Sequence, residues 1–111
     1  MVAISFSKQD FIDKILTGQK TTTIRKTNRL REQQMLKNGL QLYYKQRTKE
    51  CRKICDAKVV WILRVDDIQL WLKNISKDGI AQGDGFRDNN EMREFFKDAS
   101  GEYSVIIFKV I

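Results

Sequence analysis

The chain contains no histidine and no proline, and it has only two cysteines among its 111 residues. The lack of histidine excludes Ser-His-Asp and Cys-His catalysis and every histidine-containing metal site. Without proline, the turns must be made by glycine and short polar residues. Cys51 and Cys55 lie four residues apart with no other soft ligand nearby, so the sequence predicts neither a metal site nor a cofactor.

Long hydrophobic runs are also missing. The longest ones, at residues 59–63 and 105–108, are far shorter than the roughly 20 residues that a membrane-spanning helix needs. The N-terminus has neither the basic start nor the cleavage site of a signal peptide. We therefore expect a cytoplasmic, monomeric protein of one domain, residues 1–111, without a membrane partner. In that compartment the cysteines are expected to stay reduced, although they could pair.

Charge is unevenly distributed along the chain. The sequence has 21 Lys and Arg against 14 Asp and Glu, a formal net charge of +7. Eleven of the basic residues and only two of the acidic ones lie between Gln19 and Lys53. Such a segment attracts polyanions through counterion release and electrostatic steering. It favours a nucleic acid or nucleotide as partner, and the alternative is a solvated surface that keeps the protein in solution.

The first third of the chain predicts a strand, a helix and a second strand. Residues 2–6 alternate as a short strand does. Ser7 is the expected N-cap of a helix over residues 8–17, and Gly18 stands where a helix-terminating glycine belongs. Residues 20–25 form a threonine-rich strand, in which period-two alternation places Thr21, Thr23 and Arg25 on one face. Lys20 lies at the entry of that strand.

The middle of the chain predicts further strands. Residues 28–37 are either a loop or a short helix, and Asn38-Gly39 is a turn signal before a half-buried strand that places Leu40, Leu42 and Tyr44 inward. Residues 48–55 are expected to be a charged connection. Residues 57–65 form a mostly apolar strand with Trp61 inward.

The last third is predicted to contain a helix and a closing strand. Residues 68–71 either extend the preceding strand or begin a helix, and residues 76–84 are a loop or a short helix. Asn89 or Asn90 caps a helix that turns Met92, Phe95 and Phe96 inward, and residues 103–111 close the chain as a strand. This order favours a mixed α+β fold with a small, partly closed barrel.

Three short motifs occur in order along the chain. The first is Gly18-x-Lys20-x-x-Thr23-x-Arg25 after a helix, and the second is Lys37-Asn38-Gly39 before a strand. The third is Asp84-Gly85-Phe86 before a helix that carries Glu91-Met92 and Phe95-Phe96. In these motifs the chain resembles the ASCH domain family, a branch of the PUA-like superfamily. The acidic residue that the family usually has just after the second glycine is missing.

The resemblance implies a small PUA-like β-barrel flanked by two or three helices, with a cleft beside the first motif. It implies RNA or a modified nucleoside as partner. Because it has a threonine at Thr23, the first motif looks most like that of the bacterial branch that hydrolyses N4-acetylcytidine to cytidine and acetate. In that branch a lysine, a threonine and a glutamate are the proposed catalytic set, which correspond here to Lys20, Thr23 and Asp84. An aspartate at the third position is one methylene shorter than the glutamate.

These residues suggest a hydrolytic mechanism without histidine. Thr23 would attack the acetyl carbonyl, and Lys20 would act as base if burial or Arg25 lowered its pKa. Asp84 would position water or protonate the departing amine, and Arg25 would hold an oxyanion or a phosphate. The plain alternative is a strand threonine, a solvated lysine and an arginine in an ion pair.

Aromatic and basic residues suggest how a nucleic acid would be held. Phe86 is a candidate ligand-binding residue, although a core role fits equally. Tyr43, Tyr44, Trp61 and Trp71 are possible stacking partners, but most of them fit a core better, since Tyr44 and Trp61 fall at inward-facing positions. The candidate nucleic-acid-binding residues are Arg29, Arg31, Lys45, Arg47, Lys49, Arg52 and Lys53.

Three functions remain open from the sequence. They are hydrolysis of N4-acylated cytidine, non-catalytic RNA binding and, ranked lowest, a metal-independent ribonuclease acting on single strands.

Overall fold

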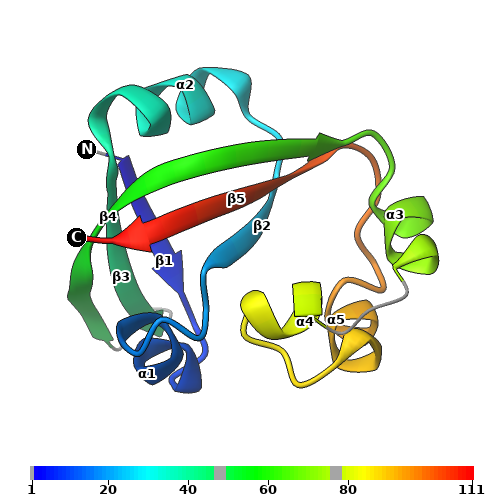
Figure 1. Cartoon of the computed structure of the whole chain (residues 1–111), viewed down its shortest axis with the longest axis horizontal. Coiled ribbons are helices and arrows are strands. Elements are labelled where there is room, and N and C mark those ends of the chain that lie inside the picture. Colours follow the sequence, from blue (N-terminus) through cyan, green and yellow to red (C-terminus); the bar gives the residue numbers. More distant parts are fainter. Residues whose placement is uncertain (1, 47–49, 76–78) are drawn as a thin grey trace.

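The computed structural model describes residues 2–46, 50–75 and 79–111. Its centre is a five-stranded sheet in the order β1-β3-β4-β5-β2, in which β1 pairs with β3 in parallel and every other pairing is antiparallel. The sheet curls into a half-barrel whose two edge strands are β1 (Val2–Phe6) and β2 (Thr22–Lys26). Figure 1 shows β4 and β5 crossing the molecule side by side, with α3, α4 and α5 gathered away from the two termini.

Helix α1 (Asp10–Leu16) and β2 confirm the helix and the strand predicted around the first motif. The predicted cap was wrong, because the helix begins after Gln9 and has no side-chain cap. Gly18 ends the helix with a φ of 81°, a conformation that only glycine adopts without strain, and its N–H donates to Ile15. The chain thereby reverses within a few residues and enters β2.

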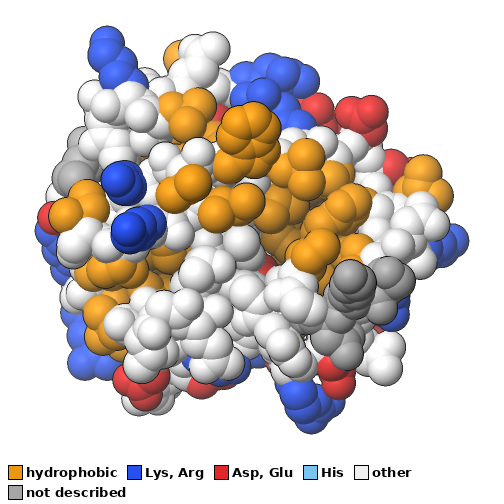
Figure 2. All heavy atoms as spheres, viewed as in Figure 1, with side chains coloured by type: hydrophobic (Ala, Val, Ile, Leu, Met, Phe, Trp, Pro, Cys, Tyr) orange, Lys and Arg blue, Asp and Glu red, His pale blue; other side chains and the backbone are white. Residues whose placement is uncertain are grey.

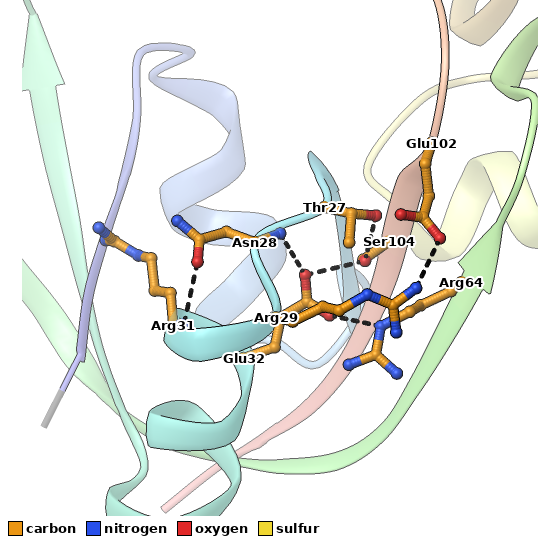
Figure 3. Close-up of polar contacts among 8 residues, drawn as sticks. All are labelled: Thr27, Asn28, Arg29, Arg31, Glu32, Arg64, Glu102 and Ser104. Atoms are coloured by element: carbon orange, nitrogen blue, oxygen red, sulfur yellow. Dashed lines mark hydrogen bonds and ion pairs between the residues drawn. The ribbon is translucent and has the colours of Figure 1, made fainter.

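Helix α2 (Arg29–Asn38) resolves the open choice between loop and helix at residues 28–37. The Asn28 side chain accepts from the Arg31 N–H, and the Glu32 carboxylate accepts from the Asn28 N–H, which is a variant of the capping box. Glu32 is almost fully buried and also accepts from Arg64 on β4 and Ser104 on β5 (Figure 3). One carboxylate therefore ties α2 to the half-barrel.

Replacing Glu32 with glutamine is expected to destabilise the fold by about 1.5–3 kcal/mol, since hydrogen bonds to a buried charge contribute about that much. The measurement is urea unfolding at neutral pH. Glu102→Gln is the matched control, because Glu102 pairs with the exposed Arg29, and an exposed pair contributes about 0–1 kcal/mol. Equal losses in both variants would contradict the anchoring role of Glu32.

Strands β3 (Leu40–Gln46) and β4 (Glu50–Val65) correct the prediction of a charged connection at residues 48–55. Residues 50–55 are strand and pair with residues 42–46 of β3, while residues 47–49 lie outside the described residues. Cys51, Arg52 and Lys53 are all exposed, so the hydrophobic alternation that marks a strand is absent. Cys51 and Cys55 both have free thiols.

The sequence predicted that Leu40, Leu42, Tyr44 and Trp61 face the core. This is confirmed for Leu40, Leu42 and Tyr44, which are buried, but it is wrong for Trp61, which is 60% exposed. The register of β4 against β5 shifts between Val59 and Trp61, and a β-bulge of this kind reverses the alternation of side chains that follow it. Figure 2 shows hydrophobic side chains gathered on the face of the molecule that β4 and β5 cross.

The region after β4 is helical. Asp67 caps α3 (Ile68–Asn74) through the Gln69 and Leu70 N–H groups, which resolves the choice at residues 68–71 in favour of a helix. The short α4 (Gly79–Gly83) follows the undescribed residues 76–78. Helix α5 (Asn89–Phe95) is capped by Asp88, so the predicted caps Asn89 and Asn90 were one or two residues late.

Strand β5 (Tyr103–Val110) closes the fold as predicted, in the middle of the sheet between β4 and β2. Phe96 and Met92 lie in the core as expected, whereas Phe95 is 57% exposed, contrary to the prediction. The mixed α+β fold is confirmed. The described residues form five helices rather than two or three, and four of the five have no more than seven residues. None of these helices is long and apolar enough to cross a membrane.

Candidate functional site

A cavity of about 160 Å³ lies where the end of β1, helix α1, strand β2 and the segment after α4 meet. It brings together Lys20, Thr23, Arg25, Asp84 and Phe86, the five catalytic and ligand-binding residues predicted from the sequence. The remaining lining residues are Ser5, Phe6, Ser7, Lys8, Phe11, Ile24, Phe95 and Phe96. Two sequence segments more than 60 residues apart therefore build one site.

Lys20 is buried at the floor of the site, with 2% of its surface exposed. Its Nζ donates to the Thr22 carbonyl at 2.7 Å and to the Asp84 carbonyl, and lies 3.4 Å from Asp84 Oδ1. Burial lowers the pKa of Lys20 to about 8, and Asp84 opposes this shift while Arg25 adds to it. The lysine is therefore close to releasing its proton at neutral pH.

Asp84 is positioned by backbone contacts between its loop and the segment that leads into β2. The Thr21 N–H donates to Gly83 O at 2.7 Å, and Lys14 Nζ donates to Gly85 O at 2.7 Å. Gly85 has a φ of 96°, and a Cβ there would lie 2.7 Å from the Phe11 ring and 3.1 Å from the Lys20 side chain. The glycine after Asp84 is thus required by both backbone conformation and space.

The Asp84 carboxylate is almost fully buried and accepts a hydrogen bond from the Thr22 hydroxyl at 3.0 Å. Burial raises the pKa of Asp84 to about 6, although Lys20, Thr22 and Arg25 all favour the charged form. Asp84 and Lys20 thus have pKa values displaced toward neutrality from opposite sides. Such perturbed pairs in a cleft are frequent at functional sites.

Thr23 and Arg25 lie on one face of β2, as the alternation predicted. Arg25 Nε donates to Thr23 Oγ1 at 3.0 Å, and Arg25 Nη2 donates to Ser5 O on β1 at 2.7 Å. Thr23 is buried, and its hydroxyl accepts from a cation, which stabilises negative charge on that oxygen. The geometry gives Thr23 a rigid position on the sheet and a polarised hydroxyl.

Phenylalanine rings form the walls. Phe86 packs edge-on against Phe11 with ring centroids 6.0 Å apart and also contacts Phe95 and Phe96, so it is both core and lining. Lys8 Nζ lies 5.2–5.9 Å from the centroids of Phe11, Phe86 and Phe95, and Lys20 lies 4.4 Å from that of Phe11. Cations already occupy the ring faces, which disfavours a cationic ligand.

The predicted nucleic-acid-binding residues do not form one track. Arg31 lies on α2 near Arg25, whereas Arg29 on the same helix pairs with Glu102. Lys45, Arg52 and Lys53 lie on the β3–β4 hairpin, where Lys53 pairs with Asp56 at 2.8 Å. Arg47 and Lys49 lie outside the described residues. No group of acidic or cysteine side chains in residues 2–46, 50–75 and 79–111 is arranged to hold a metal ion.

Among the members of the site that the sequence missed, four interact with the predicted residues or form the walls. Thr22 was assigned to the opposite face of β2, but at the first residue of the strand its hydroxyl reaches Asp84. Phe6, Phe11 and Lys8 belong to β1, α1 and their connection, and their pattern signalled only core and surface. Lys8 could have been suspected only from its place before an aromatic helix face. None of Tyr43, Tyr44, Trp61 and Trp71 is among the described lining residues of the cavity.

Known structures share this arrangement of strands and helices. Crystal structures of two mutants of the ZmASCH protein from Zymomonas mobilis superpose with a TM-score of 0.61 at 18% and 16% identity, over 96% of this chain. The ASCH domain from Lactobacillus crispatus JV V101 superposes over 98% of this chain and 78% of its own length, with a TM-score of 0.57 at 14% identity.

The fold is ASCH-like. This ASCH-like chain spans about two thirds (66% and 67%) of the length of the Zymomonas chains. No protein-family model and no curated protein matches the sequence. At such identities the likeness concerns the fold, and the activity must be argued from the residues of the site.

Proposed function

We propose that this ASCH-like chain recognises a base of RNA or of a modified nucleoside in the aromatic cavity, and that it hydrolyses N4-acetylcytidine to cytidine and acetate. The observation that carries the proposal is the buried pair of Lys20 and Asp84, 3.4 Å apart, in the same cavity as Thr23. A pair of ionisable groups is expensive to bury. A site for proton transfer explains why it is buried here.

The size and lining of the cavity fit a single base. Its volume of about 160 Å³ is well below the roughly 300–1,000 Å³ of pockets for drug-sized ligands. A planar heterocycle would lie against the phenylalanine walls at the ring edges, since Lys8 and Lys20 lie over the ring faces, and its exocyclic group would face the polar floor. The ribose would remain toward solvent.

The protonation states needed for catalysis are compatible with the contacts of Lys20. A neutral amine keeps two N–H donors, enough for the Thr22 and Asp84 carbonyls to which Nζ donates. Its lone pair then replaces the third hydrogen. Lys20 and Asp84 together share one proton around neutral pH, and the form with a neutral amine and a protonated carboxyl is the reactive one.

The first half of the reaction transfers the acetyl group. Thr23 Oγ1 attacks the acetyl carbonyl carbon and its proton passes to the Lys20 amine, while Arg25 stabilises the developing oxyanion. The C–N4 bond then breaks as Asp84 gives its proton to N4. Cytidine leaves, and the acetyl group remains on Thr23 as an ester.

In the second half, water attacks the ester and gives a proton to the Asp84 carboxylate. The Thr23 oxygen leaves and regains its proton from the Lys20 ammonium. Acetic acid departs and ionises in solution, so both catalytic groups return to their starting states. Asp84 has a shorter side chain than the glutamate of the branch that the chain resembles, and it lies directly beside Lys20 and Thr22.

The test is chromatographic conversion of N4-acetylcytidine to cytidine by the purified chain. Turnover that Lys20→Ala abolishes supports the proposal. If N4-acetylcytidine is not cleaved between pH 5 and 9 at high enzyme concentration, the proposal of hydrolysis is wrong, and only the proposal of base recognition stands.

The pH dependence of kcat/KM is expected to be bell-shaped, with apparent pKa values of about 6 and about 8. Below about 6 the pair carries two protons because Asp84 is protonated beside a charged Lys20, and above about 8 it carries none. The profile is measured with the nucleoside under kcat/KM conditions. A flat profile from pH 5 to 9 would contradict a role of this pair in proton transfer.

A second candidate function is RNA binding without catalysis. It is favoured by the eleven basic residues between Gln19 and Lys53, which a free nucleoside does not need. This function would be supported if single-stranded RNA binds with a steep salt dependence and N4-acetylcytidine is not turned over.

A further inference from the structure

A second cavity lies beside the base cavity, in the seam between the two edge strands of the half-barrel. Its volume is about 360 Å³, and its lining includes residues of β1, of β2 and of the start of α2. The two cavities share Ser5 and Arg25 in their walls. The two cavities are therefore adjacent, so that neighbouring parts of one ligand could occupy both.

The seam is bridged by arginines rather than by paired strands. Strands β1 and β2 are the ends of the sheet order and do not pair with each other. Arg25 donates to the Ser5 carbonyl at 2.7 Å, and Arg31 donates to the Ala3 carbonyl. Since residues 3 and 5 direct their carbonyls to the same side of the edge strand, the two guanidinium groups lie in a row along it.

These two arginines differ from others in the chain. Arg29, Arg64 and Arg87 each form an ion pair with a carboxylate. In the part of the chain that the structure describes, neither Arg25 nor Arg31 has a carboxylate within 4 Å. Glu32 lines the same cavity, but its oxygens are engaged by Arg64, Asn28 and Ser104.

The two guanidinium groups also repel each other. Burial lowers the pKa of Arg25, the Asp84 carboxylate opposes this shift, and the like charge of Arg31 adds to it. Each guanidinium has five N–H donors, and only some of them are used by the contacts to Ser5, Thr23 and Ala3. A phosphate between the two arginines would relieve the repulsion and accept the remaining donors.

We propose that the seam cavity between Arg25 and Arg31 binds the phosphodiester and the neighbouring nucleotide of a single-stranded RNA whose target base occupies the first cavity. The exposed Ser5 hydroxyl, in the wall common to both cavities, is a further donor to that phosphate. The inference rests on the proposed function and narrows it, because it makes a nucleotide within a strand, rather than a free nucleoside, the preferred ligand.

Arg29 provides a matched control for Arg31. Both residues lie in the first turn of α2 and both are exposed. Figure 3 shows that they leave the helix in opposite directions, Arg31 toward β1 and Arg29 toward Glu102. Arg29→Gln therefore removes the same charge from the same helix without touching the seam cavity.

The experiment compares a fluorescein-labelled RNA trinucleotide with N4-acetylcytidine at its centre and the free nucleoside. The wild type is expected to bind the trinucleotide at least tenfold more tightly than the nucleoside. Arg31→Gln should weaken trinucleotide binding about tenfold and reduce its salt slope by about 0.7, the value for one phosphate of a single strand. Nucleoside binding should be unchanged in Arg31→Gln, and both affinities should be unchanged in Arg29→Gln. Arg31→Lys, which keeps the charge, should recover part of the loss.

The outcomes separate the inference from the proposed function. If the nucleoside binds and the trinucleotide binds no better, the seam site is wrong and the base cavity stands. Equal losses from Arg31→Gln and Arg29→Gln would also overturn the seam site, because they indicate diffuse attraction. If the trinucleotide binds in a way that depends on Arg31 but the nucleoside does not bind, the seam site is supported and base recognition in the first cavity is wrong. If neither ligand binds the wild type, both proposals fail.

Discussion

Replacing Thr23 with valine is expected to lower kcat/KM for N4-acetylcytidine by at least about 10³-fold, since the loss of a nucleophile removes a covalent intermediate. Valine keeps the β-branched shape of the side chain on β2, so the strand should remain intact, while Arg25 Nε loses its acceptor. The nucleoside should still bind, and the loss should be seen mainly in kcat. Steady-state kinetics with titration calorimetry of the nucleoside separates the two effects.

Thr21→Val is the matched control, because Thr21 lies two residues earlier, is exposed and does not line the base cavity. It should retain turnover within about twofold. If Thr23→Val keeps substantial activity, Thr23 is not the nucleophile, and water attacking directly beside Asp84 becomes the mechanism to test. The turnover of Thr22→Val should lie between those of Thr21→Val and Thr23→Val, because Thr22 only positions the Asp84 carboxylate.

How much of the site could be predicted follows from where its residues lie. Lys20, Thr23 and Arg25 occupy one helix-turn-strand segment, and local spacing was sufficient to single them out. Asp84 is 64 residues from Lys20, and only the resemblance to a family linked the two. Apart from Phe86, the aromatic walls were not predicted, because a phenylalanine that lines a cavity has the same sequence pattern as one that fills a core.

The errors in the fold have comparable physical causes. Residues 50–55 were assigned to a connection because Cys51, Arg52 and Lys53 are all exposed, and hydrophobic alternation exists only where every second residue is buried. Trp61 was placed inside because a bulge in β4 cannot be detected from the alternation that it interrupts. The strands whose one face packs on the core, such as the one beginning at Leu40, were predicted well.

The ionic pair at the floor of the site should reduce the stability of the fold. The pKa of Lys20 falls to about 8 and that of Asp84 rises to about 6, so the folded state disfavours the charged form of both groups. For Asp84 this cost is present above about pH 6 and disappears as the pH falls toward 3.8. For Lys20 it is present below about pH 8 and disappears as the pH rises toward 10.5. Between about 6 and 8 both costs act together.

The double variant Lys20→Met with Asp84→Asn is therefore expected to be about 1–4 kcal/mol more stable than the wild type at pH 7, and inactive. The asparagine oxygen still accepts from Thr22, whereas the Thr22 and Asp84 carbonyls lose the Lys20 amine as donor, which places the expected gain at the lower end of this range. Each single variant leaves one buried charge without its partner and should lose about 3–5 kcal/mol. Urea unfolding of the four proteins at pH 7 gives the free energies.

The control for this cycle is the exposed pair of Lys97 and Glu94, replaced by methionine and glutamine, which should change stability by less than about 1 kcal/mol. The gain of the double variant should shrink at pH 4, where folded Asp84 is already protonated. If the double variant is much less stable than the wild type, the ion pair stabilises the fold. A more stable but inactive one would mean that the fold tolerates two costly charges because the chemistry of the site requires them.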